Sequence, residues 1–346
     1  MAMAVFIVCQ AASCHPVAEG RFRPSMGVVG KSVSELGGNI MVIYQDSSGN
    51  HWFGSWESGV YRFDGKQLLQ YTVEQGLPSN RVDEIHEDGS GNLYFVGCHP
   101  HSTVAKFNGE TFQTLQAVPS RAWTLNATDL WMRHAFGQEK VLRYDGVNLH
   151  ELELPRPPHL SHISFEVYCM ERDSRGHVWL GTNPVGVCRF NGKSLDWITE
   201  EDVTEFKNDG ANGVRSMVED HRGFLWFNTA QRYEIVDSVR AGGKFYARHR
   251  GIGGLDGAAD SRLNEFLSAV RDAENNLWFV TYRDGVWKYD GFQMAHFDVQ
   301  ELEKSIQLYS ISIDRNGKLW LGTHENGAFW FDGTDFVRFR PAVSPP

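Results

Sequence analysis

The sequence has few of the features that mark metal-binding, membrane-spanning or nucleic-acid-binding proteins. Its five cysteines include no CxxC pair, and their odd number and spacing fit neither a zinc site nor a complete disulfide framework. No apolar run reaches the roughly 18 residues that a transmembrane helix needs. The net charge is −10 and no basic cluster occurs, so nucleic acid is not an expected partner.

Short motifs of several common enzyme classes are also missing. The sequence contains no GxSxG nucleophile elbow, no HExxH helix and no phosphate-binding loop. We therefore expect neither a resident cofactor nor a metal ion, and we assign no catalytic residue.

What the sequence does contain is a repeat rich in glycine and aromatic residues. The segment DSSGNHWFGSWESGVYRFDGKQLLQYT, residues 46–72, returns in varied form six more times. The central aromatic residues lie 37 to 52 positions apart and are Trp52, Tyr94, Trp131, Trp179, Trp226, Trp278 and Trp320. A period of about 40–50 residues with four short strands per unit is typical of a propeller blade. The sequence therefore predicts an all-β fold, a single seven-bladed β-propeller of four-stranded antiparallel blades over residues 38–340.

One repeat shows how the chain is expected to fold within a blade. Residues 41–46, 50–55, 59–64 and 67–72 are predicted to form strands a to d of an antiparallel meander, with turn residues between them. Aspartates recur at the a–b turn, at 46, 173, 220, 272 and 314, and we expect them to accept backbone N–H bonds there. The tryptophans are predicted to be buried between blades. The third repeat, NATDLWMRH, lacks the acidic glycine turn, which predicts an irregular blade.

The two ends of the chain are predicted to lie outside the propeller. Residues 1–37 are interpreted as a leader, because an apolar run over residues 2–8 precedes small residues and Cys14. This pattern favours export to the periplasm or the cell exterior, and it leaves a lipid anchor open. The segment GRFRPSMG, residues 20–27, is a candidate for an extra strand that closes the ring. Residues 341–346 are interpreted as a C-terminal tail.

The repeat resembles a known bacterial family. The pattern DxxGx-aliphatic-W-[FL]-G-T, then GVx[RK][FY][DN]G, an aromatic tail and GLPSN at residues 76–80 resembles the two-component regulator propeller repeat. The resemblance covers about residues 38–339. It implies a periplasmic ligand-binding sensor region of the kind found in hybrid histidine kinases, or an exported stand-alone relative that acts in signal transduction. Such sensors often add a second propeller, a linker domain, a membrane helix and a kinase, so phosphotransfer by this chain would require a separate partner sensor protein.

The candidate site follows from which loops vary. The a–b and c–d turns share one face and are uniform, whereas the b–c and d–a loops share the opposite face and differ from blade to blade. Variable loops on a repeated scaffold are where binding sites usually lie. On that face the b–c loops are expected to place ligand-binding residues, namely Trp56, Glu57, His99, His101, Arg133, His134, Asn183, Arg232, Tyr282, Arg283, His324 and Glu325. This mixture suits a sugar-like or anionic small molecule, including a glycan. The two longest d–a connections, residues 200–213 and 250–264, are expected to wall the site.

Three function hypotheses remain open at this point. The first is a non-enzymatic module that binds a ligand or a protein through the variable face. The second is an enzyme that resembles the streptogramin lyases, which share the DGNLWF type of strand, with one of the histidines as general base. The third is a scaffold that binds proteins along its blade edges. A metal site built from His99, His101, His134 and His324 is disfavoured, because the mouth of a propeller separates these side chains.

Overall fold

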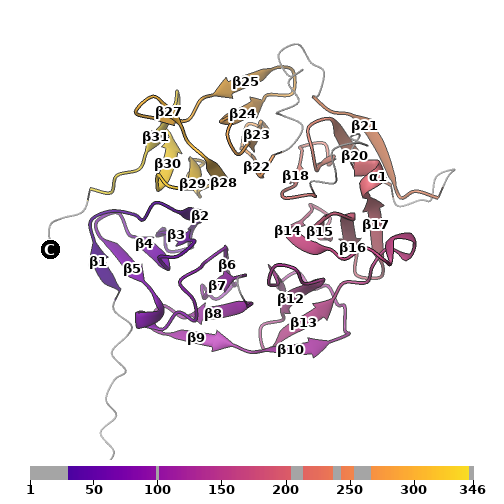
Figure 1. Ribbon diagram of the computed structural model, residues 1–346, viewed down its shortest axis with the longest axis horizontal. Helices are drawn as coiled ribbons and strands as arrows, with labels where there is room; N and C mark the ends of the chain where they lie inside the picture. Colours follow the sequence, from indigo (N-terminus) through magenta and orange to yellow (C-terminus); the bar gives the residue numbers. More distant parts are fainter. Residues whose placement is uncertain (1–29, 99–100, 204–212, 237–242, 253–265, 343–346) are drawn as a thin grey trace, which may run out of the picture.

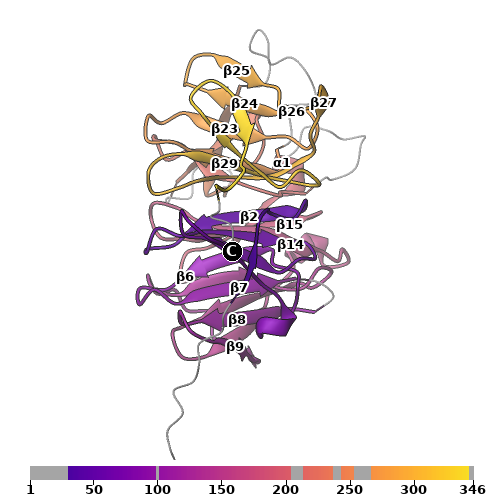
Figure 2. The same ribbon diagram turned by 90° about the vertical axis from the view of Figure 1, so that its left-hand side faces the viewer.

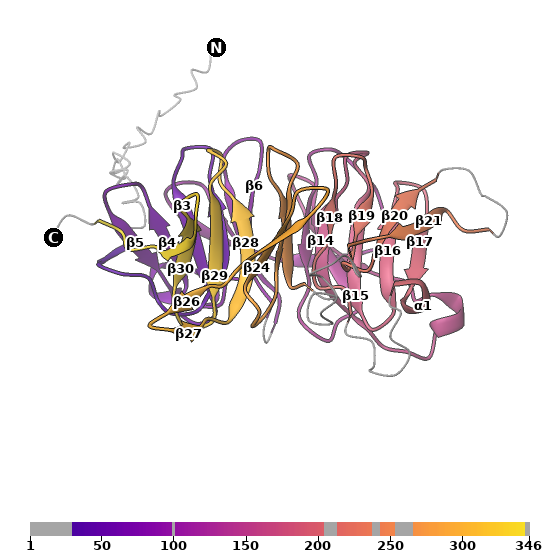
Figure 3. The same cartoon turned by 90° about the horizontal axis from the view of Figure 1, so that it is seen from above.

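The computed structural model describes residues 30–98, 101–203, 213–236, 243–252 and 266–342. Seven β-sheets stand around a central axis like the blades of a propeller (Figure 1). Figure 2 shows the strands of one blade stacked outward from the axis, and Figure 3 shows the inner strands running along it. The seven-bladed propeller that the repeats predict is confirmed.

Each blade is one sheet, and its strands follow the chain outward from the axis except in blade three. Blade one contains β2 (Ile40–Gln45), β3 (His51–Ser55), β4 (Val60–Phe63) and β5 (Leu68–Tyr71), with β1 (Lys31–Val33) added outside. Blade two contains β6 (Glu84–Glu87), β7 (Leu93–Gly97), β8 (Thr103–Phe107) and β9 (Phe112–Leu115). Blade three contains β10 (Ala117–Ser120), β11 (Leu130–Arg133), β12 (Lys140–Tyr144) and β13 (Leu149–Glu153). Blade four contains β14 (Glu166–Arg172), β15 (Val178–Asn183), β16 (Gly186–Phe190) and β17 (Leu195–Thr199).

The second half of the ring repeats this arrangement. Blade five contains β18 (Val218–Glu219), β19 (Leu225–Trp226), β20 (Gln231–Ile235) and β21 (Tyr246–Arg250). Blade six contains β22 (Ser268–Arg271), β23 (Leu277–Val280), β24 (Val286–Tyr289) and β25 (Met294–Phe297). Blade seven contains β28 (Leu308–Ile313), β29 (Leu319–Thr323), β30 (Ala328–Phe331) and β31 (Phe336–Arg338). The connections carry a small hairpin, β26 (Gln300–Glu301) and β27 (Lys304–Ser305), and short helical turns η1 (Val73–Gln75), η2 (Pro158–Leu160) and α1 (Glu200–Val203).

The recurring aspartate does more than the sequence predicts. In blade five, one carboxylate oxygen of Asp220 accepts the backbone N–H of Phe224 at 3.0 Å, as expected for a turn. The other oxygen accepts the indole Nε1–H of Trp226 at 3.1 Å. In blades one, two, four, six and seven the turn aspartate likewise accepts one backbone N–H and one bond from the central aromatic side chain, which is an indole N–H or, in blade two, the hydroxyl of Tyr94. The aspartate therefore fixes both the turn and the buried ring, because a buried indole N–H needs an acceptor.

Blade three is irregular, as its degraded repeat predicts. In the described residues β11 is the innermost strand of this blade, and β10 is added at the outer edge in parallel with β13. Leu125 occupies the repeat position of the turn aspartate. Accordingly the buried Nε1 of Trp131 has no hydrogen-bond partner among the described residues. Because an inner strand is missing, β11 faces the axis and brings Trp131 and Arg133 to it.

The ring closes by packing between blades one and seven. Phe53 stacks on Phe339 with ring centroids 5.5 Å apart, and Trp320 meets Phe53 edge-on at 5.8 Å. Gly322 permits this approach, since a Cβ there would lie 2.5 Å from the Ile40 carbonyl oxygen. No strand is exchanged between these two blades within the described ranges. The segment 20–27, considered for closure, lies outside those ranges, and the strand that follows it, β1, instead extends the outer edge of blade one.

Candidate functional site

A cavity of about 770 Å³ lies on the propeller axis and opens at the face of the b–c and d–a loops. Inner strands of six blades and the segment that precedes β18 in blade five contribute to its wall, and we call it the axial cavity. Its wall is formed mainly by Met41, Val42, Trp56, Arg81, Asp83, Glu84, His86, Trp131, Arg133, Phe136, Tyr168, Met170, Glu171, Arg215, Ser216, Ser268, Tyr282, Tyr309 and Ile311. The missing inner strand of blade three explains why side chains of β11 reach it.

The mouth of the axial cavity is lined by accessible aromatic rings. Trp56, Phe136 and Tyr282 are 40%, 38% and 37% exposed, which is unusual for side chains of this size. Trp56 and Tyr282 follow the second strands of blades one and six, so the b–c loops deliver them. Tyr168 and Tyr309 come from the inner strands β14 and β28.

Arginines accompany these rings. The guanidinium carbon of Arg81 lies 3.5 Å from the Trp56 ring centroid and 5.2 Å from that of Phe136. Arg81 is held in place by Asp83, whose carboxylate accepts its Nε–H at 2.9 Å. Arg215 lies 4.4 Å from the Tyr168 ring. Stacked cations and aromatic faces of this kind recognise flat or anionic polar ligands.

A charged cluster lies deeper, between blades two and three. Glu84 pairs with the guanidinium of Arg133, accepts the Arg133 backbone N–H at 3.2 Å and contacts His86 Nε2 at 3.0 Å. Burial alone would raise the pKa of Glu84, but the nearby Arg133 and His86 outweigh it and hold this pKa at about 2. The same ion pair raises the pKa of Arg133 above its ordinary value, against the desolvation that opposes it. Both groups are therefore charged at neutral pH.

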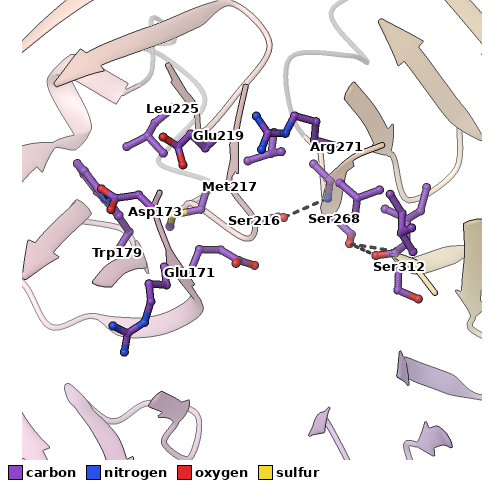
Figure 4. Close-up of a pocket in the computed structure, with 16 residues that line it drawn as sticks. Glu171, Asp173, Trp179, Ser216, Met217, Glu219, Leu225, Ser268, Arg271 and Ser312 are labelled. Carbon is purple, nitrogen blue, oxygen red and sulfur yellow. Dashed lines mark hydrogen bonds between the residues drawn. The ribbon is translucent and has the colours of Figure 1, made fainter. Parts of the chain in front are cut away.

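Glu171 stands apart from this cluster, on the inner strand β14. It lies where the axial cavity meets a second cavity of about 420 Å³ that leads toward the a–b turns (Figure 4). Both cavities also share Ser216, Ser268 and Ile311. Desolvation by the surrounding protein raises the pKa of Glu171 to about 7, Glu84 adds to the rise and His86 opposes it. The Glu171 side chain nevertheless stays exposed to solvent where the two cavities meet. This contact with water limits how far desolvation raises its pKa.

The structure gathers part of the predicted residue set around the axial cavity. Trp56, Arg133 and Tyr282 line it directly. Asn183 donates to the Tyr168 hydroxyl at 3.0 Å, and Arg283 lies 5.6 Å from the Tyr282 ring. His324 lies 5.3 Å from the Tyr309 ring and 3.5 Å from the carboxylate of Glu325, and Glu57 is exposed beside Trp56. These eight residues therefore line or adjoin the axial cavity.

Other predicted residues lie elsewhere. His101 and His134 line a separate cavity of about 490 Å³ between blades two and three. His134 contacts Glu151 at 2.9 Å, and desolvation lowers its pKa below the ordinary value despite that carboxylate. Arg232 lies within β20, and its guanidinium carbon lies 4.7 Å from the ring centroid of Phe224 in the same blade. His99 and most of the two long d–a connections lie outside the described residues.

Several cavity residues do not appear in the sequence-based set, notably Arg81, His86, Tyr168, Glu171 and Arg215. They stand on the inner strands or on the d–a segments that lead into them, whereas the sequence argument searched the b–c loops. A signal was present, because inner strands line the axis of any propeller and EIHE and EVYCMER carry polar side chains there.

The described part of the chain carries neither a metal-binding cluster nor a membrane-spanning helix. No group of three or more His, Cys, Asp or Glu side chains there is arranged to hold a metal ion. None of its helical segments has the length and apolarity that crossing a membrane requires.

Comparisons with known proteins bear on the repeat and on the fold. The model of the family described as "Two component regulator propeller" matches residues 34–57 and 166–183. No curated protein matches the sequence. The extracellular domain of BT4673 from B. thetaiotaomicron, described as part of a one component or hybrid two component system, is 17% identical with a TM-score of 0.59. That match covers 88% of this chain and 39% of the other, so the chain spans less than half of that structure.

A second similar structure has a different function. Virginiamycin B lyase from Staphylococcus aureus is 13% identical, with a TM-score of 0.61 over 86% of this chain and 97% of the lyase. At such identities both likenesses show the fold alone. Two segments of the chain therefore match the two-component regulator propeller model, and the chain as a whole folds as a seven-bladed β-propeller.

Proposed function

We propose that this protein is a non-enzymatic sensor-type propeller that binds a small polar ligand in the axial cavity, at the face of the b–c and d–a loops. The observation that carries the proposal is the mouth of accessible aromatic rings backed by arginines. Exposing an aromatic ring to water is unfavourable unless a ligand or a partner covers it. Three such rings around one opening therefore favour a ligand site. Sensor-type relatives favour a place outside the cytoplasm and a separate protein that receives the signal.

The structure supports a ligand pocket over a flat protein interface. The axial cavity has the volume of a small-molecule site, and residues from all seven blades line it. Four of its charged side chains are already paired, since Arg81 bonds Asp83 and Arg133 bonds Glu84. The mouth is therefore organised before a ligand arrives, which reduces the entropy cost of binding.

Replacing the most accessible ring should abolish binding. We expect one class from a panel of oligosaccharides, uronic acids, small carboxylates, phosphate and short peptides to raise the melting temperature of the wild-type protein. A ligand at 100 times its Kd stabilises the folded state by about 2.7 kcal/mol. In Trp56→Ala this rise should disappear, because the ligand loses its stacking surface. Differential scanning fluorimetry measures both effects.

Phe292→Ala is the matched control, because Phe292 is 89% exposed on a turn of blade six and lines none of the cavities described above. It should keep the full ligand-dependent rise. A panel without any active class would count against the pocket and favour a protein scaffold instead.

A lyase is the second candidate, favoured by one observation. His86 is the histidine that lines the axial cavity in the described residues, and its Nε2 contacts Glu84 at 3.0 Å. Neither His134 nor His324 lines that cavity, so His86 is the general base to test. If the protein is a lyase, His86→Ala should lower turnover of a bound substrate by at least 100-fold while the substrate still raises the melting temperature. Mass spectrometry that finds every bound ligand chemically unchanged after prolonged incubation rejects the lyase.

A further inference from the structure

The axial cavity is charged differently along its length. Asp83, Glu84, Arg81 and Arg133 are paired with one another and contribute no net charge. Two opposite charges remain. Arg215 lies at the mouth with its guanidinium over the Tyr168 ring, and Glu171 lies in the interior. Neither side chain forms an ion pair with any described residue.

Of these two residues, Glu171 gives the stronger indication of the ligand's charge. Its carboxylate lines both the axial cavity and the second cavity, and in the described part of the chain it accepts no hydrogen bond (Figure 4). The nearby serine hydroxyls bond to other groups instead of the Glu171 carboxylate. Ser216 accepts the Ala269 backbone N–H, and Ser268 bonds both backbone groups of Ile311. The Glu171 side chain is exposed to solvent in these cavities, so its carboxylate is open to a cation. An ammonium group of a ligand would supply that cation.

The distance between the two charges limits the size of the ligand. Arg215 stacks on Tyr168, and Tyr168 and Glu171 are three positions apart on β14, which runs along the axis (Figure 3). At about 3.3 Å per strand residue the Cα atoms of Tyr168 and Glu171 are roughly 10 Å apart, which sets the scale for the separation of the two charged groups. An extended tripeptide with free ends separates its ammonium and carboxylate groups by about the same length.

We propose that the ligand of the axial cavity is a zwitterion of about tripeptide length, with its ammonium group at Glu171 and its anionic group at Arg215. The aromatic mouth encloses the middle of such a ligand. This inference rests on the proposed function, because it names the chemical class that the same cavity would take.

Isothermal titration calorimetry with triglycine, N-acetyl-triglycine and triglycine amide tests the inference. Wild-type protein should bind triglycine and should bind each end-blocked form at least tenfold more weakly. Glu171→Gln should weaken triglycine binding at least tenfold. This variant should bind triglycine and N-acetyl-triglycine equally, because the contact between the peptide ammonium group and residue 171 is already lost. Arg215→Gln should show the matching pattern with the amide. The Gln side chains keep the shape of Glu171 and approximate that of Arg215, and melting curves confirm folding.

Glu110→Gln is the control, since Glu110 is exposed on a c–d turn at the opposite face. It should bind all three peptides as the wild type does. Absence of triglycine binding, or equal binding by the Glu171 and Glu110 variants, overturns the zwitterion. If another ligand class then binds and Trp56→Ala abolishes that binding, the proposed function stands without the inference. If Trp56→Ala has no effect on any ligand, the proposed function itself fails.

Discussion

Arg133→Met should lower the free energy of unfolding by about 3–5 kcal/mol, because it leaves the partly buried carboxylate of Glu84 without its guanidinium. Methionine keeps much of the packing volume of the arginine stem, so the loss reports mainly on charge. Among the residues that the structure describes, His86 and the backbone N–H of residue 133 then remain as the partners of Glu84. Urea denaturation at pH 7 measures the change.

The loss of stability in Arg133→Met should depend on pH in a defined direction. The pKa of Glu84 is about 2 in the folded protein, below its ordinary value of 4.5. The pair therefore contributes its full stabilisation above about pH 4.5 and loses it as the pH falls toward 2. The difference in unfolding free energy between wild type and Arg133→Met should therefore shrink as the pH falls from about 4.5 toward 2. A gap that stays constant down to pH 3 would mean that lost packing, not lost charge, causes the destabilisation.

Two further variants separate the ion pair from general effects. Adding Glu84→Gln to Arg133→Met should recover most of the lost stability, because no unpaired charge then remains. Arg283→Met removes an exposed arginine that lies only over the Tyr282 ring, and it should change stability by less than about 0.5 kcal/mol.

The repeat determines most of the fold, and this explains why sequence alone predicted it. Six of the seven blades use the same local devices, an aspartate turn and a buried aromatic side chain, so several weak signals reinforce one another. The strands predicted for the first repeat match β2 to β5 within two residues at each end. The irregular third blade was also predictable, because the loss of the turn aspartate is visible at Leu125.

The site was less predictable for a physical reason. Repeats show which residues vary, and that identified Trp56 and Tyr282, but they do not show which variable side chains converge. Glu84 of blade two meets Arg133 of β11 because blade three lacks its inner strand. Arg81, on the segment that leads into blade two, meets Trp56 from a loop of blade one. His134 lies next to Arg133 in sequence yet faces another cavity, since neighbouring residues of a strand point to opposite sides.

Asp220→Ala should destabilise the protein by about 3 kcal/mol. Asp220 is buried and accepts the N–H groups of Arg222 and Phe224 as well as the indole N–H of Trp226. A buried donor left without an acceptor costs about 1–3 kcal/mol, and Trp226 is only 1% exposed, so water cannot replace the carboxylate at the indole. Urea denaturation followed by tryptophan fluorescence measures the loss.

Asp332→Ala is the matched control on a c–d turn. Asp332 is exposed and accepts only the backbone N–H groups of Thr334 and Asp335, which water can bond instead. Its removal should cost less than about 1 kcal/mol. If both variants lost equally little, the aspartates would act only in the turns.

Blade three shows what should remain after Asp220 is lost. Trp131 is 7% exposed although its indole N–H has no partner among the described residues. Burial of the ring, which stacks on Trp123 at 5.7 Å, is therefore sufficient to keep it between blades. Trp226 should likewise stay buried in Asp220→Ala, with an unshifted emission maximum in the folded state. The aspartate then adds stability to a packing arrangement that hydrophobic burial already specifies.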